Sequence, residues 1–356
     1  MTISYKWLLD YLPVELDTEK ISFILNSIGL EVERLDKFES VKGSLLGLVI
    51  GEVLEVEKHP NADKLSLTKV NIGEEIPLHI VCGAPNVAAG QKVVVAPVGA
   101  TIYPTNGEPI TMRLAKIRGH ESQGMICAED EIGLGTSHDG ILILDNNAIP
   151  GTLASDYFSI YTDYIFEIGL TPNRSDAMSH LGVARDICAY LSHHENKQFN
   201  VVSPYPTHFE EKTEDLIQIQ VEDTSACPRY SGISIHNVTI KPSPNWLVQR
   251  LKAIGVRPIN NVVDVTNYVL HETGQPLHAF DAEKITGNKI IVQKLPTGTK
   301  FNSLDEKERQ LHEDDLVICD GDSNPMCLAG VFGGLGSGVT AHTTQLFLES
   351  ASFNAG

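Results

Sequence analysis

The chain has 356 residues, of which 42% are hydrophobic, and its 27 basic and 46 acidic side chains give a formal net charge of −19. This length exceeds what a single hydrophobic core usually supports, so two or three globular domains are expected. No run of about 18 apolar residues is present to cross a membrane, and the first residues lack the basic and apolar regions of a secretory signal. The six cysteines show no C-x-x-C spacing, which argues against a zinc site or a disulfide framework and favours a reducing cytoplasm.

The first residues predict a helix followed by a strand. Apolar side chains recur at helical spacing over residues 18–29, and Asp17 is placed to cap the start of this helix. The next residues, GLEVERL, alternate as in a strand. More than a hundred residues later, residues 163–191 predict a strand, a Thr-Pro-Asn-Arg turn and a second helix. Neither piece alone has enough apolar surface to bury a core, so we predict that residues 1–39 and 153–199 form one discontinuous α+β domain.

Residues 40–152, which separate these two pieces, alternate short β-rich runs with turn residues. Several short strands at this spacing are typical of a small β-barrel. The segments HPNADKL, IVCGAPN, IRGHESQGM and DGILIL resemble the OB-fold tRNA-binding domain of several synthetases and of free-standing tRNA-binding proteins. This resemblance makes six residues candidates for contacts with tRNA: Lys58, His59, Lys64, Arg113, Lys116 and Arg118.

The charge of the same stretch argues against such contacts. OB folds hold single-stranded nucleic acid in a basic groove with stacking aromatic side chains. Residues 40–152 contain eight Lys or Arg against thirteen Asp or Glu, and Tyr103 is their only aromatic residue. Because few phosphates can be neutralised, the chain alone is expected to hold tRNA weakly. Direct contact with tRNA and a purely structural barrel therefore both stay open.

Residues 200–356 predict a third unit, of mixed α/β structure. Residues 216–240 alternate as two strands around an acidic turn, and the runs KIIVQKL and DLVICD supply further strands. Residues 243–255 predict a helix that starts at Ser-Pro and stops at Gly. The apolar face of this helix would consist of Trp246, Leu247, Leu251 and Ile254.

Three segments of this unit carry side chains suited to chemistry. Polar residues within 257–281 fall beside several valines, as expected for groups that line a concave site. A glycine-rich run, LAGVFGG, follows at 328–334 and indicates tight turns or close backbone approach. Glu349 lies in the apolar segment LFLESASF and requires a partner or a ligand, because carboxylates are almost never fully buried unless paired. The polar residues of the first segment are Thr266, Asn267, Gln275 and His278.

In this order, the three segments closely resemble the B3/B4 editing domain of the β chain of bacterial phenylalanyl-tRNA synthetase, which hydrolyses tyrosine mis-attached to the phenylalanine tRNA. The resemblance implies an α+β multidomain fold: a small N-terminal domain interrupted by an inserted OB-fold barrel, then a mixed α/β editing domain, incomplete at its C-terminus. The implied partners are the synthetase α subunit, in an α2β2 heterotetramer, and tRNA(Phe), in the cytoplasm and with no membrane. No cofactor or metal is expected in this fragment, whereas ATP and Mg²⁺ are expected for the complete synthetase.

The resemblance also implies a role for each site residue. Glu349 would accept the phenolic hydroxyl of tyrosine, and His278 would orient the tyrosyl ester and a water molecule. Thr266 and Asn267 would hold the aminoacyl group, while Arg257 would meet the terminal adenosine. The alternative is a non-catalytic tRNA-binding or scaffold module, in which the histidine and the glutamate are core residues. If the segment is an editing site, its pocket would be shaped by Pro276, Ala279, Ala329 and Gly330.

Overall fold

The computed structural model describes residues 1–206, 208 and 217–354, and these form two compact units. One, here called the barrel unit, is Lys37–Asp163. The other, here called the split unit, joins Met1–Asp36 to Tyr164–Gly356. Leu216, the first residue of a predicted strand, lies outside the described residues.

The barrel unit is a nearly closed, barrel-like sheet with the strand order β11-β6-β3-β4-β5, and β12 also pairs with β6. Hydrogen bonds join its two edges: the Gln123 N–H donates to the His79 carbonyl at 2.8 Å, and the Val81 N–H donates to the Ser122 hydroxyl at 3.1 Å. The buried apolar side chains form two clusters on opposite faces of β6: Val94 and Ala96 belong to one, and Val93 and Val95 to the other. The elements are β3 Val49–Lys58, β4 Ser66–Asn71, β5 Leu78–Cys82, β6 Lys92–Pro97, β7 Thr101–Ile102, β8 Ile110–Thr111, β9 Ala115–Ile117, β10 His120–Ser122, β11 Gly124–Ile126, β12 Ile143–Leu144 and α3 Ala154–Tyr157.

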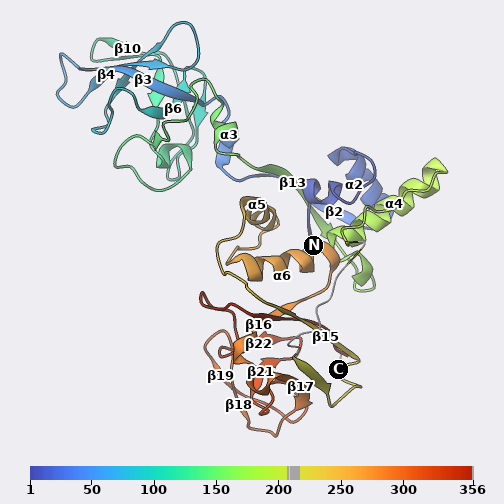
Figure 1. Ribbon diagram of the computed structural model, residues 1–356. Coiled ribbons are helices and arrows are strands. Elements are labelled where there is room, and N and C mark those ends of the chain that lie inside the picture. Colours follow the sequence, from blue (N-terminus) through green and yellow to red (C-terminus); the bar gives the residue numbers. More distant parts are fainter. Residues whose placement is uncertain (207, 209–216, 355–356) are drawn as a thin grey trace. The chain divides into compact units, whose positions relative to one another are not determined.

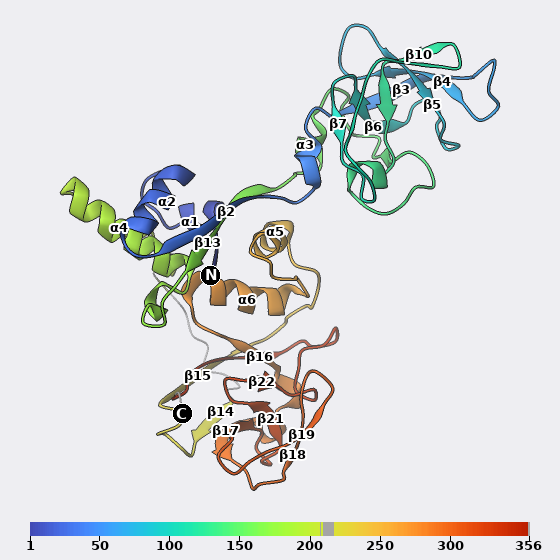
Figure 2. The same ribbon diagram turned by 180° about the vertical axis from the view of Figure 1, so that it is seen from behind.

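The N-terminal part of the split unit packs helices against a three-stranded sheet of order β1-β13-β2 (Figure 2). The predicted helix over 18–29 is confirmed as α2, and Asp17 caps it by accepting a hydrogen bond from the Lys20 N–H at 2.7 Å. Side chains from both ends of the gap in sequence, such as Leu25 and Phe166, share one core. The elements are β1 Thr2–Ser4, α1 Tyr5–Leu9, α2 Thr18–Ser27, β2 Glu31–Glu39, β13 Thr162–Gly169 and α4 His180–Glu195.

From residue 217 to residue 354, the split unit contains two main sheets and the helices α5 and α6. A five-stranded sheet has the order β14-β17-β20-β21-β22, and a three-stranded sheet has the order β15-β23-β16. Figure 1 shows the smaller sheet between α6 and the larger sheet. The elements are β14 Gln218–Val221, β15 Arg229–Ile235, α5 Asn245–Ala253, α6 Asn261–Thr273, β16 His278–Asp281, β17 Lys289–Lys294, β18 Lys300–Asn302, β19 Glu308–Gln310, β20 Leu316–Cys319, β21 Pro325–Leu328, β22 Phe332–Gly333 and β23 Leu346–Ser352.

Helix α6 is a feature that the sequence pattern did not predict. Its residues are rich in β-branched side chains, which favour strands. The Asn260 side chain nevertheless caps the start by accepting hydrogen bonds from the Val262 and Val263 N–H groups, both at 3.0 Å. Gly274 ends the helix in the left-handed region, with φ of +84°. The two predicted strands within 216–240 do form, but β14 and β15 belong to different sheets.

The predicted apolar face of α5 is only partly correct. Leu247, Leu251 and Ile254 are buried as predicted, whereas Trp246 is 54% exposed. Its ring stands edge-on to the Tyr268 ring of α6, at a centroid distance of 5.5 Å. Trp246 therefore covers the side of α6 instead of entering the core.

An aromatic contact from α6 and a charged contact from α5 join these helices to the N-terminal part of the split unit. The Trp7 indole stacks on His180 on one side and on Tyr268 on the other, with centroid distances of 4.1 and 4.4 Å. The Arg250 guanidinium pairs with Asp10 at 2.6 Å. Stacked aromatic pairs of this kind add stability beyond the area they bury, so the position of α6 depends on residues far away in sequence.

Candidate functional site

Strand pairing brings His278 and Glu349 together. The two residues are directly opposite in the antiparallel pair of β16 and β23. Opposite residues project from the same face, with Cβ atoms roughly 5 Å apart. The same face carries Phe280 and Phe347, which are fully buried against the larger sheet. Both polar side chains therefore point into the space between the two sheets.

Glu349 is buried, and one of its oxygens is already engaged. Its exposed fraction is 6%, and the Tyr230 hydroxyl donates to Oε2 at 3.1 Å. The other oxygen, Oε1, accepts no hydrogen bond from a described residue. It remains accessible to solvent. Burial raises the pKa of Glu349 to about 7, although the Tyr230 hydrogen bond acts in the opposite direction. The carboxyl group thus offers one accessible acceptor oxygen and titrates near neutral pH.

His278 is a partly buried imidazole with unused nitrogens. Burial lowers its pKa, so the ring is neutral at pH 7. Neither nitrogen bonds to a described residue, and the ring stands edge-on to Phe280 at 4.5 Å. Gly333 lies directly beside it: a Cβ at this glycine would lie 2.8 Å from Cε1 of His278. A neutral imidazole with free nitrogens can accept a proton from water or orient a bound ester.

The two polar site residues Thr266 and Asn267 lie on α6 and differ in their hydrogen bonds. The Thr266 hydroxyl donates to the Val263 carbonyl of its own helix at 2.8 Å. The Asn267 amide makes no hydrogen bond to a described residue. No hydrogen bond joins either residue to His278 or Glu349 in the described part of the chain. The structure therefore brings the histidine and the glutamate together but does not link them to α6 through side-chain bonds.

The other residues predicted to bind the substrate do not all lie on the His278 face of the small sheet. Ala279 is paired with Leu348, so it faces the side of the small sheet opposite to His278. Ala329 packs on the core beside the larger sheet. Gly330 has φ of +69°, and a Cβ there would lie 3.1 Å from the Phe353 ring. Pro276 and Arg257 are exposed, the arginine in the connection between α5 and α6.

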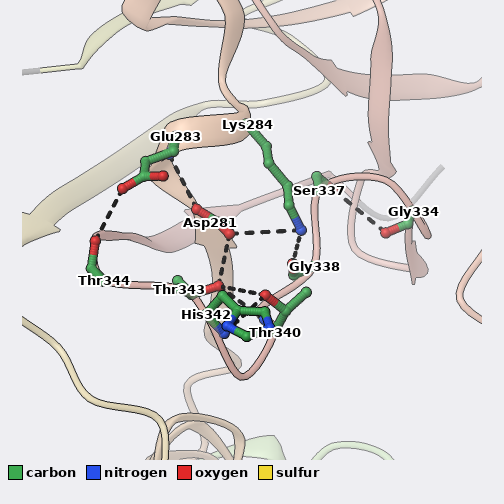
Figure 3. Close-up of polar contacts among 10 residues, drawn as sticks. All are labelled: Asp281, Glu283, Lys284, Gly334, Ser337, Gly338, Thr340, His342, Thr343 and Thr344. Atoms are coloured by element: carbon green, nitrogen blue, oxygen red, sulfur yellow. Dashed lines mark hydrogen bonds and ion pairs between the residues drawn. The ribbon is translucent and has the colours of Figure 1, made fainter.

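A polar network anchors the loop between the glycine-rich run and β23 (Figure 3). Asp281, the last residue of β16, accepts a hydrogen bond from the Thr343 hydroxyl at 2.7 Å, and both residues are buried. Lys284 lies 3.6 Å from the same carboxylate and donates to the Gly338 carbonyl at 2.7 Å. The Asp281 N–H donates to the Ser337 carbonyl at 3.0 Å. This loop connects β22, which carries Gly333, to β23, which carries Glu349. The network therefore fixes the chain between the two strands that lie beside His278.

Tyr230 and two cysteines complete the surroundings of Glu349, and sequence analysis did not assign them to the site. Burial raises the pKa of the Cys227 and Cys327 thiols, and the nearby Glu349 carboxylate raises them further. Tyr230 and Glu349 are 119 residues apart. No local pattern marks such a pair, and the apolar segment around Glu349 indicated only that a partner was needed.

The barrel unit gathers several of the predicted cationic residues. His59 is 5% exposed, its Nδ1 accepts a hydrogen bond from the Asn61 N–H at 3.0 Å, and its ring stands edge-on to His120 at 4.8 Å. This burial means that His59 does not present its ring to a phosphate. The ring contact does join the β3–β4 loop to the β9–β10 hairpin. The exposed cationic residues on these segments are Lys58, Lys64, Lys116 and Arg118.

A cavity of about 470 Å³ also lies in the barrel unit. Its lining is mainly apolar and includes Arg113, Glu131 and His138. The Glu131 carboxylate is engaged by the Ala128 N–H at 2.7 Å. Size alone does not make this cavity the reactive site, because the free acceptor and the free imidazole both lie in the split unit.

The described residues contain no membrane-spanning helix and no cluster of metal ligands. None of their helices is long and apolar enough to span a membrane. No group of three or more His, Cys, Asp or Glu side chains among them is arranged to hold a metal ion.

The chain is similar to known proteins in two separate parts and along its whole length. A family model described as a putative tRNA binding domain matches residues 48–153, and a B3/4 domain model matches residues 226–356. The phenylalanine–tRNA ligase β subunit of Bacteroides thetaiotaomicron is 54% identical over 355 residues, and that of Porphyromonas gingivalis is 53% identical over 358 residues; each match covers 99% of this chain and 43% of the relative. A solved N-terminal fragment of the phenylalanyl-tRNA synthetase β subunit from Pyrococcus horikoshii aligns at 16% identity and a TM-score of 0.33, covering 54% of this chain and 56% of that one.

The relatives that match along this chain are subunits of an aminoacyl-tRNA synthetase. More specifically, the chain matches an N-terminal part of phenylalanine–tRNA ligase β subunits. The chain spans 43% of the length of these relatives.

Proposed function

We propose that this chain is the N-terminal part of a phenylalanine–tRNA ligase β subunit and that its split unit hydrolyses tyrosine mis-attached to tRNA(Phe). The observation that carries this proposal is the pairing of His278 with Glu349 across two strands, with free imidazole nitrogens and an accessible Oε1. The ester is removed by water, in a site for which we propose no metal or covalent nucleophile.

The need for such a site follows from the limits of selectivity. An apolar pocket discriminates against an added hydroxyl by only about a hundredfold, whereas a site that hydrogen-bonds a hydroxyl can reject the analogue without it by roughly 10⁴ to 10⁵. Tyrosine differs from phenylalanine by one hydroxyl. Oε1 of Glu349 accepts the phenolic hydroxyl in this proposal, which also supplies a partner for a buried carboxylate. Phenylalanine would leave that oxygen without a partner.

The other site residues are assigned by position around this pair. His278 orients the tyrosyl ester and the attacking water, for which a neutral ring is suited. Asn267, whose amide is unused, and Thr266 hold the aminoacyl group. The exposed Arg257 meets the terminal adenosine of the tRNA. The walls of the proposed pocket are Pro276, Ala329 and Gly330, whereas Ala279 faces the other side of the small sheet and is not one of them.

We also propose that the barrel unit is an OB-fold module that contacts tRNA. The His59–His120 contact supports this proposal, because it joins two segments that carry exposed cations. With a net charge of −19, the affinity of the chain alone is weak and falls steeply with salt. The contacting residues are Lys58, Lys64, Arg113, Lys116 and Arg118. His59 is buried and does not contact tRNA itself, but its ring packs beneath the β3–β4 loop.

The domain division and the setting of the whole protein belong to the same proposal. Residues 1–39 and 153–199 form a discontinuous N-terminal domain around the OB module of residues 40–152, and residues 200–356 form the B3/B4 editing domain; the shared core of Leu25 and Phe166 supports the first of these. The complete enzyme is cytoplasmic, pairs with an α subunit as α2β2, and uses ATP and Mg²⁺ for aminoacylation of tRNA(Phe) on the α subunit.

The test is hydrolysis of tyrosyl-tRNA(Phe) by the full α/β enzyme. His278→Ala is expected to slow deacylation by about 10²-fold, the usual contribution of a positioned acid–base group. His236→Ala replaces an exposed histidine beyond β15 and serves as the matched control. Unchanged deacylation by His278→Ala would contradict the proposal, and tRNA binding without any deacylation would support the alternative of a non-catalytic tRNA-binding module.

A further inference from the structure

We infer that Tyr230 is a specificity-determining positioning residue, whose hydroxyl holds Oε2 of Glu349 so that Oε1 faces the incoming phenol. The inference rests on the proposed function and deepens it. It concerns recognition of the tyrosine side chain and not the chemistry at the ester.

The strand register explains how this contact arises. Glu349 is opposite Gly232 on β15, and Tyr230 is opposite Ala351, two residues further along β23. Tyr230 therefore reaches Glu349 along the diagonal of the ladder, a distance that an aromatic side chain can span. A Cβ at Gly232 would lie 2.0 Å from the Phe347 ring, so the position opposite the glutamate has no room for a side chain. The diagonal tyrosine is left as the donor from this strand.

The groups that face Glu349 are Tyr230 from β15, His278 from β16, Cys227 from the segment before β15 and Cys327 from β21. None of the four is charged at neutral pH, because burial lowers the pKa of the imidazole and raises those of the two thiols and the phenol. Among the described residues, Tyr230 is the one hydrogen-bond donor to this carboxylate. It orients the group and favours its charged form.

Removing the hydroxyl therefore changes the carboxyl group in two ways. The group loses the bond that fixes its rotation, and its pKa rises because a donor to the ionised form is gone. A protonated carboxyl is a weaker acceptor for a phenol than a carboxylate, since charge-assisted hydrogen bonds are the stronger class. The site then distinguishes tyrosine from phenylalanine poorly at neutral pH and recovers when the pH is raised.

The experiment compares wild type, Tyr230→Phe and Tyr205→Phe in the full α/β enzyme, the last being a control at an exposed tyrosine. Deacylation of tyrosyl-tRNA(Phe) and phenylalanyl-tRNA(Phe) is followed from pH 6 to 9, with spontaneous hydrolysis subtracted. Tyr230→Phe is expected to lower the preference for the tyrosyl ester about tenfold at pH 7, as for loss of one hydrogen bond in a charged pair. The loss should appear in KM more than in kcat and should shrink towards pH 9.

A loss that is equal at every pH would indicate a merely structural role and would overturn the inference, as would an unchanged pH profile with full selectivity. Either result leaves the proposed function standing when wild type is active and His278→Ala is slow. A wild-type enzyme that does not deacylate tyrosyl-tRNA(Phe) overturns both the proposed function and the inference about Tyr230. Calorimetric affinity for free tyrosine at pH 7 and pH 9 gives a second readout that needs no turnover, and a Tyr230→Phe affinity equal to that of wild type at both pH values contradicts the inference.

Discussion

Replacing Glu349 by Gln should stabilise the split unit at alkaline pH and leave it unchanged at acidic pH. The folded-state pKa of about 7 lies above the ordinary value of 4.5, so the native state holds this proton more tightly than the unfolded chain does. Below pH 4.5 both states are protonated, and the group has no effect on stability. Between pH 4.5 and 7 the unfolded chain ionises first, so the free energy of unfolding falls as the pH rises. Above pH 7 the full penalty of the buried charge is present.

The size of that penalty follows from the two pKa values. The difference between 4.5 and about 7 corresponds to roughly 3 kcal/mol, at about 1.4 kcal/mol for each tenfold change in the acid equilibrium. Glutamine resembles the protonated acid in shape and carries no charge. Glu349→Gln is therefore expected to raise the free energy of unfolding by up to about 3 kcal/mol at pH 8.5 and by close to nothing at pH 4.5.

Urea denaturation followed by tryptophan fluorescence measures this difference. The chain has two tryptophans, Trp7 and Trp246, and both lie in the split unit, so the signal does not report on the barrel unit. Glu313→Gln, at an exposed glutamate, is the matched control and should show no pH-dependent gain. The reasoning is refuted when Glu349→Gln gains no more stability between pH 4.5 and 8.5 than Glu313→Gln does.

Two further substitutions test the walls of the site. Gly333→Ala places a methyl group 2.8 Å from Cε1 of His278, so it should displace the ring and lower the rate of tyrosyl-tRNA deacylation at least about tenfold, and wild-type rates would show that the ring has room to move. Thr343→Val removes a donor from the buried Asp281 and should lower the free energy of unfolding by about 1.5–3 kcal/mol in urea titrations. Thr344→Val, at an exposed neighbour, should change it by less than about 0.5 kcal/mol, and equal effects of the two threonine changes would contradict the role of the network.

Several elements of this fold follow from residues close together in the chain. Helix α2 begins at the side-chain cap of Asp17, and α5 ends just before Gly255, whose φ is +83°. Strands such as β17 and β20 follow from short apolar runs between turns. Caps, glycine conformations and apolar periodicity act within about one turn of helix or a few residues of strand, so the sequence alone predicts them. The motifs around His278 and Glu349 identify the family for the same reason, because their residues are contiguous.

Tertiary structure alone decided the rest. The valine-rich segment of α6 carries a local cap at Asn260, and Trp7, far away in sequence, stacks on its Tyr268; this packing acts against the β propensity of the segment. The bond from Tyr230 to Glu349 spans 119 residues, and that from Thr343 to Asp281 spans 62. Such contacts depend on strand register and on which sheet each strand joins, and neither is encoded in local spacing. The sequence determined which residues could do the chemistry, and the packing of the sheets determined which of them meet.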